Sequence, residues 1–235
     1  MMPGTGACSL TDTVALTRHA VRNGVAGVLM VPPFYFKNVS DDGLFAYYSE
    51  VVEQVGDDKL AVYLYHIPQF TQVPISLGLI ERLLKRYPKT IAGAKDSSGD
   101  WGNTKAMIDA FAQGGFDVFP ASESLLSKSL AIGASGCISA TVNMNPAGIH
   151  ALYQGWNSRQ GENLQAHADA IRNIFQAAPM IPAMKRVLSE FTHDPTWCVV
   201  RPPLTALSDS AATTLLTALR EVNFDMALAP VASWT

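Results

Sequence analysis

Residues 60–96 read LAVYLYHIPQFTQVPISLGLIERLLKRYPKTIAGAKD, and their pattern is the strongest indication of the fold class. It holds an apolar run at 60–65, a segment of helical periodicity at 77–86 and a second apolar run at 91–95. Short runs that are apolar on both faces are typical of strands buried in a parallel sheet. The stretch therefore predicts a strand, a helix and a parallel strand joined by a right-handed crossover.

The same strand-and-helix unit recurs on both sides of this stretch. Further apolar runs predict strands at 25–31, 116–119 and 136–140, which makes five strands in all. Helical spacing predicts helices at 11–24, 41–55, 103–112 and 124–131. From Pro146 onward the pattern is helical, at 146–191 and 210–222, with proline-rich breaks at Pro179, Pro182 and Pro202-Pro203.

Two architectures fit five consecutive βα units followed by helices. One is an open doubly wound sheet, which requires a GxGxxG loop after an early strand. Gly4-Thr5-Gly6 is only a fragment of that pattern, and no predicted strand precedes it. We therefore favour a partial (β/α) barrel over residues 1–145, followed by a helical region over 146–235 that completes the barrel and packs on it.

The composition excludes several classes of protein. The chain has 235 residues, 48% of them hydrophobic and 16% charged, and a net charge of −3, so we expect a globular protein that binds no nucleic acid. Its cysteines, Cys8, Cys137 and Cys198, lie far apart, and its histidines form no metal-ligand pair, so we expect neither metal nor cofactor. Apolar runs are too short for a membrane span, which predicts a cytoplasmic protein without a membrane partner.

The candidate chemistry lies where predicted strands end. In a parallel barrel, active residues follow the carboxyl ends of strands. Lys95 closes the run Ile91–Ala94, whose apolar character favours the neutral amine that a Schiff-base nucleophile must present. Tyr65 closes the preceding strand, and neighbouring strands lie about 4.8 Å apart, so its phenol is a candidate proton shuttle for that amine. The alternatives are a solvated lysine and a tyrosine that caps the core.

Tyr35 follows another predicted strand, within the aromatic run Phe34-Tyr35-Phe36. Such a cluster either packs at a subunit contact or lines the barrel mouth.

Six short motifs occur in order along nearly the whole chain: Gly4-Thr5-Gly6-Ala7, Val31–Tyr35, Leu64–Pro68, Gly93–Asp96, Gly136–Ala140 and Arg201–Leu204. This succession resembles the dihydrodipicolinate synthase/N-acetylneuraminate lyase family. The resemblance implies a TIM (β/α)8 barrel with C-terminal helices, usually assembled as a homo-oligomer, a dimer or tetramer. The only other partner that it implies is a small 2-oxo acid.

The resemblance also implies roles for individual residues. Lys95 matches the lysine that forms an imine with pyruvate, and Tyr65 matches the tyrosine of the YNxP motif, although His66 replaces the usual Asn. Tyr35 matches a tyrosine lent across the dimer interface as part of a proton relay. Ile138 matches a residue whose backbone lines the pyruvate site, and Thr5 is a further candidate for contact with the substrate.

One departure from the family pattern shapes the expected reaction. Phe70 stands where synthases have an arginine for the carboxylate of the second substrate, and a phenyl ring cannot form that bidentate pair. Ala121 replaces a common glycine and, with Phe70, is expected to shape the second-substrate pocket. We expect a lyase of the 4-hydroxy-2-oxoglutarate or 2-keto-3-deoxy sugar-acid type. The alternative is 4-hydroxy-tetrahydrodipicolinate synthase.

A second departure concerns the start of the sequence. Gly4-Thr5-Gly6 matches the end of the family's third strand, so the first strands and the GTTGE-like carboxylate loop are missing from the predicted barrel. The expectation at this point is a misassigned start or a truncated gene. Two further alternatives are a non-catalytic family member and a different α/β enzyme with an anion site at a helix N-terminus near Gly133–Gly136.

Overall fold

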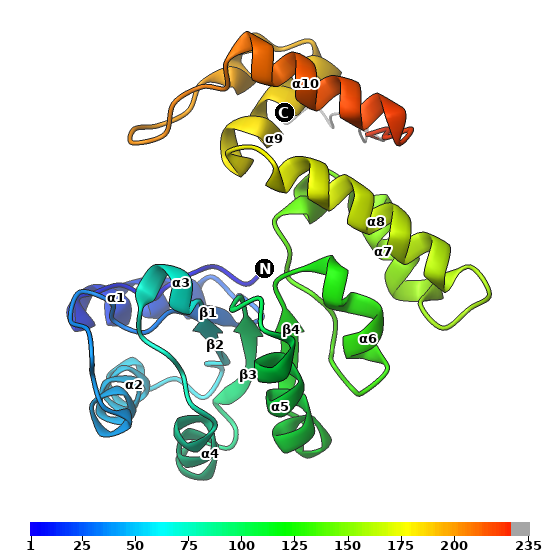
Figure 1. Cartoon of the computed structure of the whole chain (residues 1–235). Coiled ribbons are helices and arrows are strands. Elements are labelled where there is room, and N and C mark those ends of the chain that lie inside the picture. Colours follow the sequence, from blue (N-terminus) through cyan, green and yellow to red (C-terminus); the bar gives the residue numbers. More distant parts are fainter. Residues whose placement is uncertain (227–235) are drawn as a thin grey trace. The chain divides into compact units, whose positions relative to one another are not determined.

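The computed structural model describes residues 1–226, which belong to two compact units. The first unit is Met1–Ile138, and the second is Ser139–Thr235, described as far as Met226. The first unit contains a parallel sheet with helices, and the second consists of helices and their connections (Figure 1). The sequence predicted that residues 1–145 form part of a barrel and that residues 146–235 complete it. These two roles stay predictions.

The sheet of the first unit is parallel, as the sequence predicted. Within the described residues it has four strands in the order β1 (Val28–Met30), β2 (Val62–His66), β3 (Ile91–Asp96) and β4 (Asp117–Pro120). Each strand pairs in parallel with the next one along the chain, as expected for consecutive βα units. In this order β1 and β4 are the outer strands, and over residues 1–226 the sheet is not closed into a barrel.

Two further segments lie along the outer strands. On the β1 side, Thr5 donates its backbone N–H to the Leu29 carbonyl and Leu29 donates to the Pro3 carbonyl, both at 2.9 Å. On the β4 side, Ser135 and Ile138 donate to the carbonyls of Val118 and Pro120, both at 3.1 Å. These donors are three residues apart and their acceptors two apart.

This extra residue explains why the fifth predicted strand, 136–140, is not a strand in the structure. An unmatched residue on one side interrupts the regular ladder, as in a β-bulge. The segment therefore lies against β4 without forming a strand of its own.

Helices alternate with the strands, and most begin at a side-chain cap. Ser9, Ser40, Ser76 and Asp100 each accept a backbone N–H from the first turn of the helix that follows. These helices are α1 (Leu10–Arg22), α2 (Asp41–Val55), α4 (Leu77–Arg86) and α5 (Trp101–Phe111). The bounds of α2 and α4 are those predicted.

Shorter elements complete the first unit. They are α3 (Pro68–Thr71), α6 (Leu126–Leu130) and 3-10 turns at Ala112–Gly114 and Glu123–Leu125. Helix α6 ends before Gly133, and the next element is a 3-10 turn at Thr141–Asn143, so no helix N-terminus lies at Gly133–Gly136. The alternative anion site predicted there is wrong.

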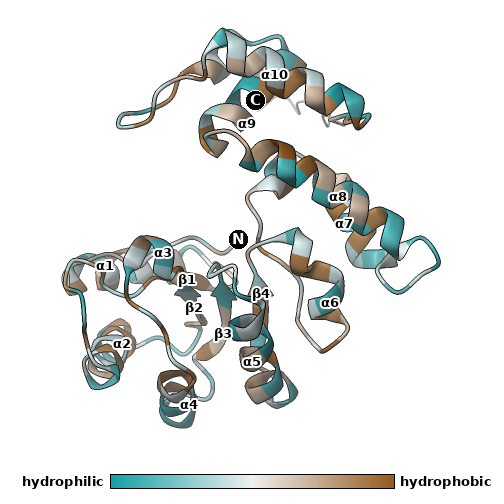
Figure 2. Cartoon of the chain, viewed as in Figure 1, coloured by the Kyte–Doolittle hydropathy of each residue, from teal (hydrophilic) through white to brown (hydrophobic). Residues whose placement is uncertain are grey.

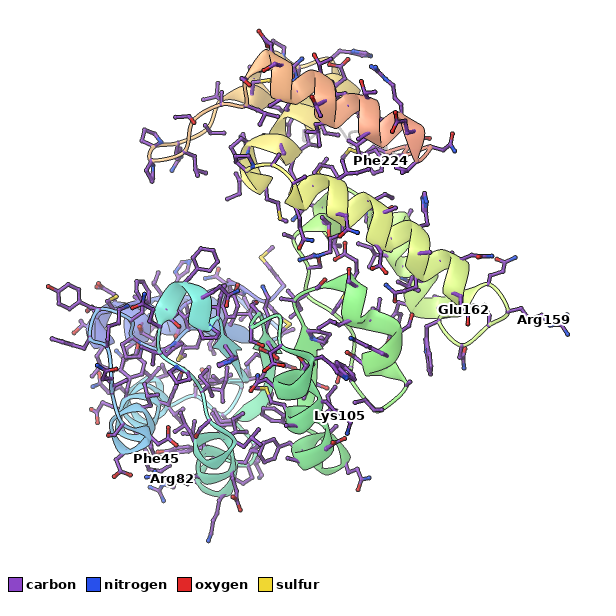
Figure 3. The ribbon with its side chains drawn as sticks, in the orientation of Figure 1. Phe45, Arg82, Lys105, Arg159, Glu162 and Phe224 are labelled. Atoms are coloured by element: carbon purple, nitrogen blue, oxygen red, sulfur yellow. The ribbon has the colours of Figure 1, made fainter. Side chains whose placement is uncertain are left out.

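The core of the first unit lies between the sheet and the helices. Val28, Leu64, Ala94 and Val118, one from each strand, are fully buried in it. Where α2 and α4 meet at the surface, the Arg82 guanidinium stacks 4.7 Å from the centroid of the Phe45 ring (Figure 3).

The second unit contains α7 (Pro146–Gly155), α8 (Gly161–Gln176), α9 (Met180–Thr192), a 3-10 turn at Pro195–Cys198 and α10 (Asp209–Glu221). The ribbons of α8 and α10 carry both hydrophobic and hydrophilic residues along their length, as amphipathic helices do (Figure 2). Phe224 packs edge-on against Phe175 and Phe191, with ring centroids 6.1 and 5.8 Å away.

The predicted break at Pro182 is wrong. This residue lies in the first turn of α9, where the missing N–H of proline would have had no partner within the helix. Among residues 1–226, no helix is both long and apolar enough to cross a membrane.

Candidate active site

The amine of Lys95 and the phenol of Tyr65 meet at the carboxyl ends of two adjacent strands. Tyr65 on β2 pairs in register with Lys95 on β3, so their side chains project from the same face of the sheet. Lys95 Nζ donates a hydrogen bond to Tyr65 Oη at 3.2 Å and lies 4.3 Å from the centroid of the tyrosine ring. Both side chains are half-buried, so the pair remains open to a small molecule.

A second tyrosine occupies the same face one step towards the amino ends of the strands. Tyr63 Oη donates to Asp117 Oδ2 at 2.9 Å, and Ser135 Oγ donates to Asp117 Oδ1 at 2.7 Å. Burial, with the Asp117 carboxylate as the next cause, raises the pKa of Tyr63 to about 12. This phenol therefore stays protonated at any physiological pH.

Glycine makes room for the Tyr63 ring. Gly93 is the register partner of both Tyr63 and Asp117, and an added Cβ would overlap the Asp117 carbonyl oxygen and lie 2.8 Å from Tyr63 Cδ1. A Cβ at Gly27 would lie 2.7 Å from Tyr63 Cε2. In the Gly93-Ala94-Lys95 run of β3, the glycine thus makes room for packing and the lysine presents a candidate nucleophile.

Tyr35 is not brought to the Lys95–Tyr65 pair by any contact of the described residues. Its side chain is 77% exposed and packs edge-on against Phe36, which is 73% exposed. Lys37 holds this aromatic loop in place, because its ammonium donates to the carbonyls of Phe34 and Thr71.

The predicted substrate-binding residues lie in different environments. Phe70 is on α3 and is 76% exposed. The backbone N–H groups of Ala121 and Ile138 donate to the carbonyls of Asp96 and Pro120 at 2.8 and 3.1 Å. Thr5 is buried, and its Oγ1 accepts a hydrogen bond from Thr17 at 3.0 Å. Their contacts with a substrate stay predictions.

Sequence reasoning missed two buried polar residues that follow the reactive pair. His66 and Asp96 are 5% and 2% exposed, and they pair in register directly after Tyr65 and Lys95. Strand alternation places them on the opposite face. The signal in the sequence was the substitution of His66 for Asn next to a predicted proton shuttle. Within the described residues, His, Cys, Asp and Glu form no group of three that could hold a metal ion.

A parallel βα fold with a lysine and a tyrosine paired at its mouth places the chain among the TIM-barrel lyases. Residues 1–222 match the profile of the dihydrodipicolinate synthetase family, and the chain belongs to that family. This confirms the resemblance that the six motifs carried.

Curated relatives of this chain support the same family assignment. An uncharacterized DapA-like lyase of Chloroflexus aurantiacus is 36% identical over 225 residues, which cover 94% of this chain and 73% of the relative. A 4-hydroxy-tetrahydrodipicolinate synthase of Thermus thermophilus is 34% identical over 87% of this chain and 67% of the relative.

Solved structures agree on the fold. Dihydrodipicolinate synthase from Agrobacterium tumefaciens superimposes with a TM-score of 0.82 at 30% identity, over 93% of this chain and 74% of that one. YagE from Escherichia coli K12, a family member solved in complex with pyruvate, gives a TM-score of 0.84 at 25% identity, over 94% and 74%. The predicted fold class, an α/β chain of the TIM-barrel type, is confirmed.

Proposed function

We propose that this chain is a class I lyase that forms an imine between Lys95 and pyruvate or a related 2-oxo acid. The observation that carries the proposal is the hydrogen bond between Lys95 Nζ and Tyr65 Oη, 3.2 Å long, at the carboxyl ends of two paired strands. A half-buried amine beside a phenol provides both a nucleophile and a group that transfers protons.

The chemistry assigns one role to each side chain. The neutral Lys95 amine attacks C2 of the 2-oxo acid, and a proton passes from the attacking nitrogen to the ketone oxygen, directly or through Tyr65, to give a carbinolamine. Tyr65 then donates a proton to the carbinolamine hydroxyl, which leaves as water while the Lys95 nitrogen forms the C=N bond. The phenolate recovers its proton from solvent, and the nitrogen keeps its own. The resulting protonated imine withdraws electrons from C3, which permits cleavage or formation of a bond there.

We propose that the 2-oxo acid cleaved is of the 4-hydroxy-2-oxoglutarate or 2-keto-3-deoxy sugar-acid type, an aldol adduct of pyruvate with an aldehyde. Phe70 argues against the synthase reaction, because an exposed phenyl ring on α3 offers no bidentate pair to the carboxylate of the synthase's second substrate. The competing candidate is 4-hydroxy-tetrahydrodipicolinate synthase, which the 34% identical Thermus thermophilus relative favours.

We further propose that Tyr35 reaches the site of a second copy of the chain. Its 77% exposed ring, flanked by exposed Phe36, supports a contact between subunits. Analytical ultracentrifugation of Tyr35→Ala tests this: we expect weaker association than in the unmodified protein. Association of equal strength would contradict it.

Borohydride reduction with pyruvate, followed by peptide mass spectrometry, tests the imine. We expect a pyruvate-derived adduct on Lys95 and none in Lys95→Ala. The matched control is Lys89→Ala, which removes an exposed lysine just before the same strand and should leave the adduct intact. A protein that is folded by circular dichroism but gives no adduct would point to a non-catalytic family member.

Retro-aldol and synthase assays then separate the substrate types. Pyruvate release is measured from 4-hydroxy-2-oxoglutarate and from 2-keto-3-deoxygluconate, and pyruvate consumption is measured with aspartate semialdehyde. Activity confined to the last pair would overturn the proposed substrate type and leave the imine proposal standing.

A further inference from the structure

A second pair of side chains anchors the ends of β2 and β3 from the face opposite to the Lys95 amine. His66 and Asp96 are register partners, both buried, and they directly follow Tyr65 and Lys95 in the sequence. The site thus has two layers, a reactive pair on one face and a buried polar pair on the other.

His66 makes two hydrogen bonds that fix the backbone after Tyr65. Its ring Nδ1 accepts the backbone N–H of Ile75 at 3.1 Å, and its carbonyl accepts the N–H of Ser97 at 2.7 Å. The first bond joins the end of β2 to the segment that leads into α4, and the second joins it to the loop after β3. His66, which accepts both bonds, is the residue directly after Tyr65.

Asp96 anchors the neighbouring strand in the same way. Its Oδ1 accepts the N–H of Ser98 at 3.0 Å, and its Oδ2 accepts from Thr104 Oγ1 at 2.6 Å and from Asn103 Nδ2 at 3.1 Å. With its own acceptors satisfied by α5 and its preceding loop, this carboxylate holds the backbone that follows Lys95. The backbone at the end of β3 is therefore held in place. The distance from Lys95 to Tyr65 then depends on where the end of β2 lies.

The hydrogen bond from Ile75 defines the state of the imidazole. An N–H donor directed at Nδ1 requires a lone pair there, so the ring is neutral and carries its proton on Nε2. Burial lowers the pKa of His66 below the usual 6.5, against the opposing charge of Asp96. At pH values above this lowered pKa the neutral ring can therefore accept the Ile75 hydrogen bond.

We propose that His66 is a positioning residue for the imine chemistry: its neutral ring fixes the end of β2 and so holds the Tyr65 hydroxyl within reach of Lys95. The inference rests on the proposed function, because it concerns the same amine and phenol. Small displacements matter, since a shift of about 1 Å in a reacting group costs on the order of 10²-fold in rate.

Two variants of His66 test the acceptor role. His66→Leu removes the acceptor, whereas His66→Asn keeps one, because Asn Oδ1 stands two bonds from Cβ as Nδ1 does. The rate of imine formation is followed by borohydride quenching over a range of pyruvate concentrations. We expect His66→Leu to lower the limiting rate about tenfold or more, with the half-saturating concentration within about twofold, and His66→Asn to stay within about threefold of the unmodified protein. An unchanged rate in the Leu variant, or equal losses in both variants, would overturn the proposal.

A measurement without pyruvate separates this inference from the proposed function. Reductive methylation of Lys95 by formaldehyde and cyanoborohydride needs no 2-oxo acid, and Lys89 in the same sample is the internal control. We expect slower methylation of Lys95 relative to Lys89 in His66→Leu and not in His66→Asn. If methylation of Lys95 slows in this way but the protein forms no pyruvate adduct, the proposed function is wrong and the positioning role stands. If the ratio of Lys95 to Lys89 methylation is the same in His66→Leu as in the unmodified protein, the positioning role is wrong.

The unmodified protein gives one more check, which does not depend on whether the variants fold. A long-range ¹⁵N spectrum distinguishes a protonated from an unprotonated Nδ1 on His66. We expect Nδ1 to be unprotonated at mildly alkaline pH. A proton on that nitrogen would exclude the bond from Ile75 and with it the proposal.

Discussion

Tyr63 and Tyr65 lie two residues apart on the same strand and the same face, and their surroundings give them opposite chemistry. Tyr63 donates to Asp117, whose other oxygen accepts from Ser135, so its hydroxyl is part of a closed network. Tyr65 instead accepts a hydrogen bond from the amine of Lys95. The residue type is the same, and the group opposite each hydroxyl decides whether it holds the sheet together or is available for proton transfer.

Removing the hydroxyl of Tyr65 should change the rate of imine formation far more than removing that of Tyr63. We expect Tyr65→Phe to slow imine formation with pyruvate by about 10²- to 10⁴-fold, because the proton donor to the carbinolamine is lost. Tyr63→Phe, the matched control on the same strand, should change the rate by less than about threefold, since its hydroxyl faces Asp117. Single-turnover borohydride trapping measures both, and similar losses in the two variants would contradict the assignment.

Gly93→Ala disturbs the packing around Tyr63 and Asp117 directly. The new Cβ would overlap the Asp117 carbonyl oxygen and press on the Tyr63 ring, so we expect the free energy of unfolding to fall by about 1–3 kcal/mol, towards the upper end of that range. Urea denaturation measures it. Gly78→Ala in α4 is the control, because its nearest neighbour would lie at 3.8 Å and alanine is the better helix former. An equal response at the two glycines would refute the packing role of Gly93.

Removal of the Tyr63 hydroxyl tests the closed network itself. Tyr63→Phe leaves Asp117 with its bond from Ser135 only, and we expect a loss of about 1–2 kcal/mol in the free energy of unfolding near neutral pH.

The pH dependence of this effect has a definite sign. The folded pKa of Tyr63, about 12, lies above its usual 10.0, so its contribution is complete below pH 10 and is lost as the pH rises towards 12. Alkaline denaturation of Tyr63→Phe should lack this component. A variant curve parallel to that of the unmodified protein would argue against it.

The smallest expected effect comes from the opposite face. The folded pKa of His66 lies below 6.5, so the unfolded chain binds the extra proton first, and stability falls as the pH drops through 6.5. We expect thermal unfolding of His66→Asn to depend less on pH over this range than that of the unmodified protein. Identical acid profiles would show that another group is responsible.

Much of this arrangement could be predicted from the sequence, because it rests on local signals. The bounds of α2 and α4 were predicted correctly, since Ser40 and Ser76 mark their starts and periodic apolar residues fill their length. The Lys95–Tyr65 contact could also be predicted, because consecutive parallel strands lie side by side and both residues lie one position before the carboxyl end of a strand.

The remaining features depend on contacts between residues far apart in the sequence. Tyr63 meets Asp117 across 54 positions, and no local pattern marks either as a partner of the other. The bond from Ile75 to His66 depends on where the chain returns after α3, a single turn too short to give a periodic signal. The fifth predicted strand differed for a similar reason, because the extra residue between Ser135 and Ile138 appears only when β4 is aligned with it.

The register of β2 and β3 has a consequence for how this chain can vary. Tyr65-His66 and Lys95-Asp96 are dipeptides in which one member faces each side of the sheet. Inserting or deleting one residue within β3 would exchange its two faces, turning Lys95 towards the helices and Asp96 towards the opposite face, and the same change within β2 would exchange Tyr65 and His66. Descendants of this sequence can therefore tolerate substitutions along these strands far better than changes in their length.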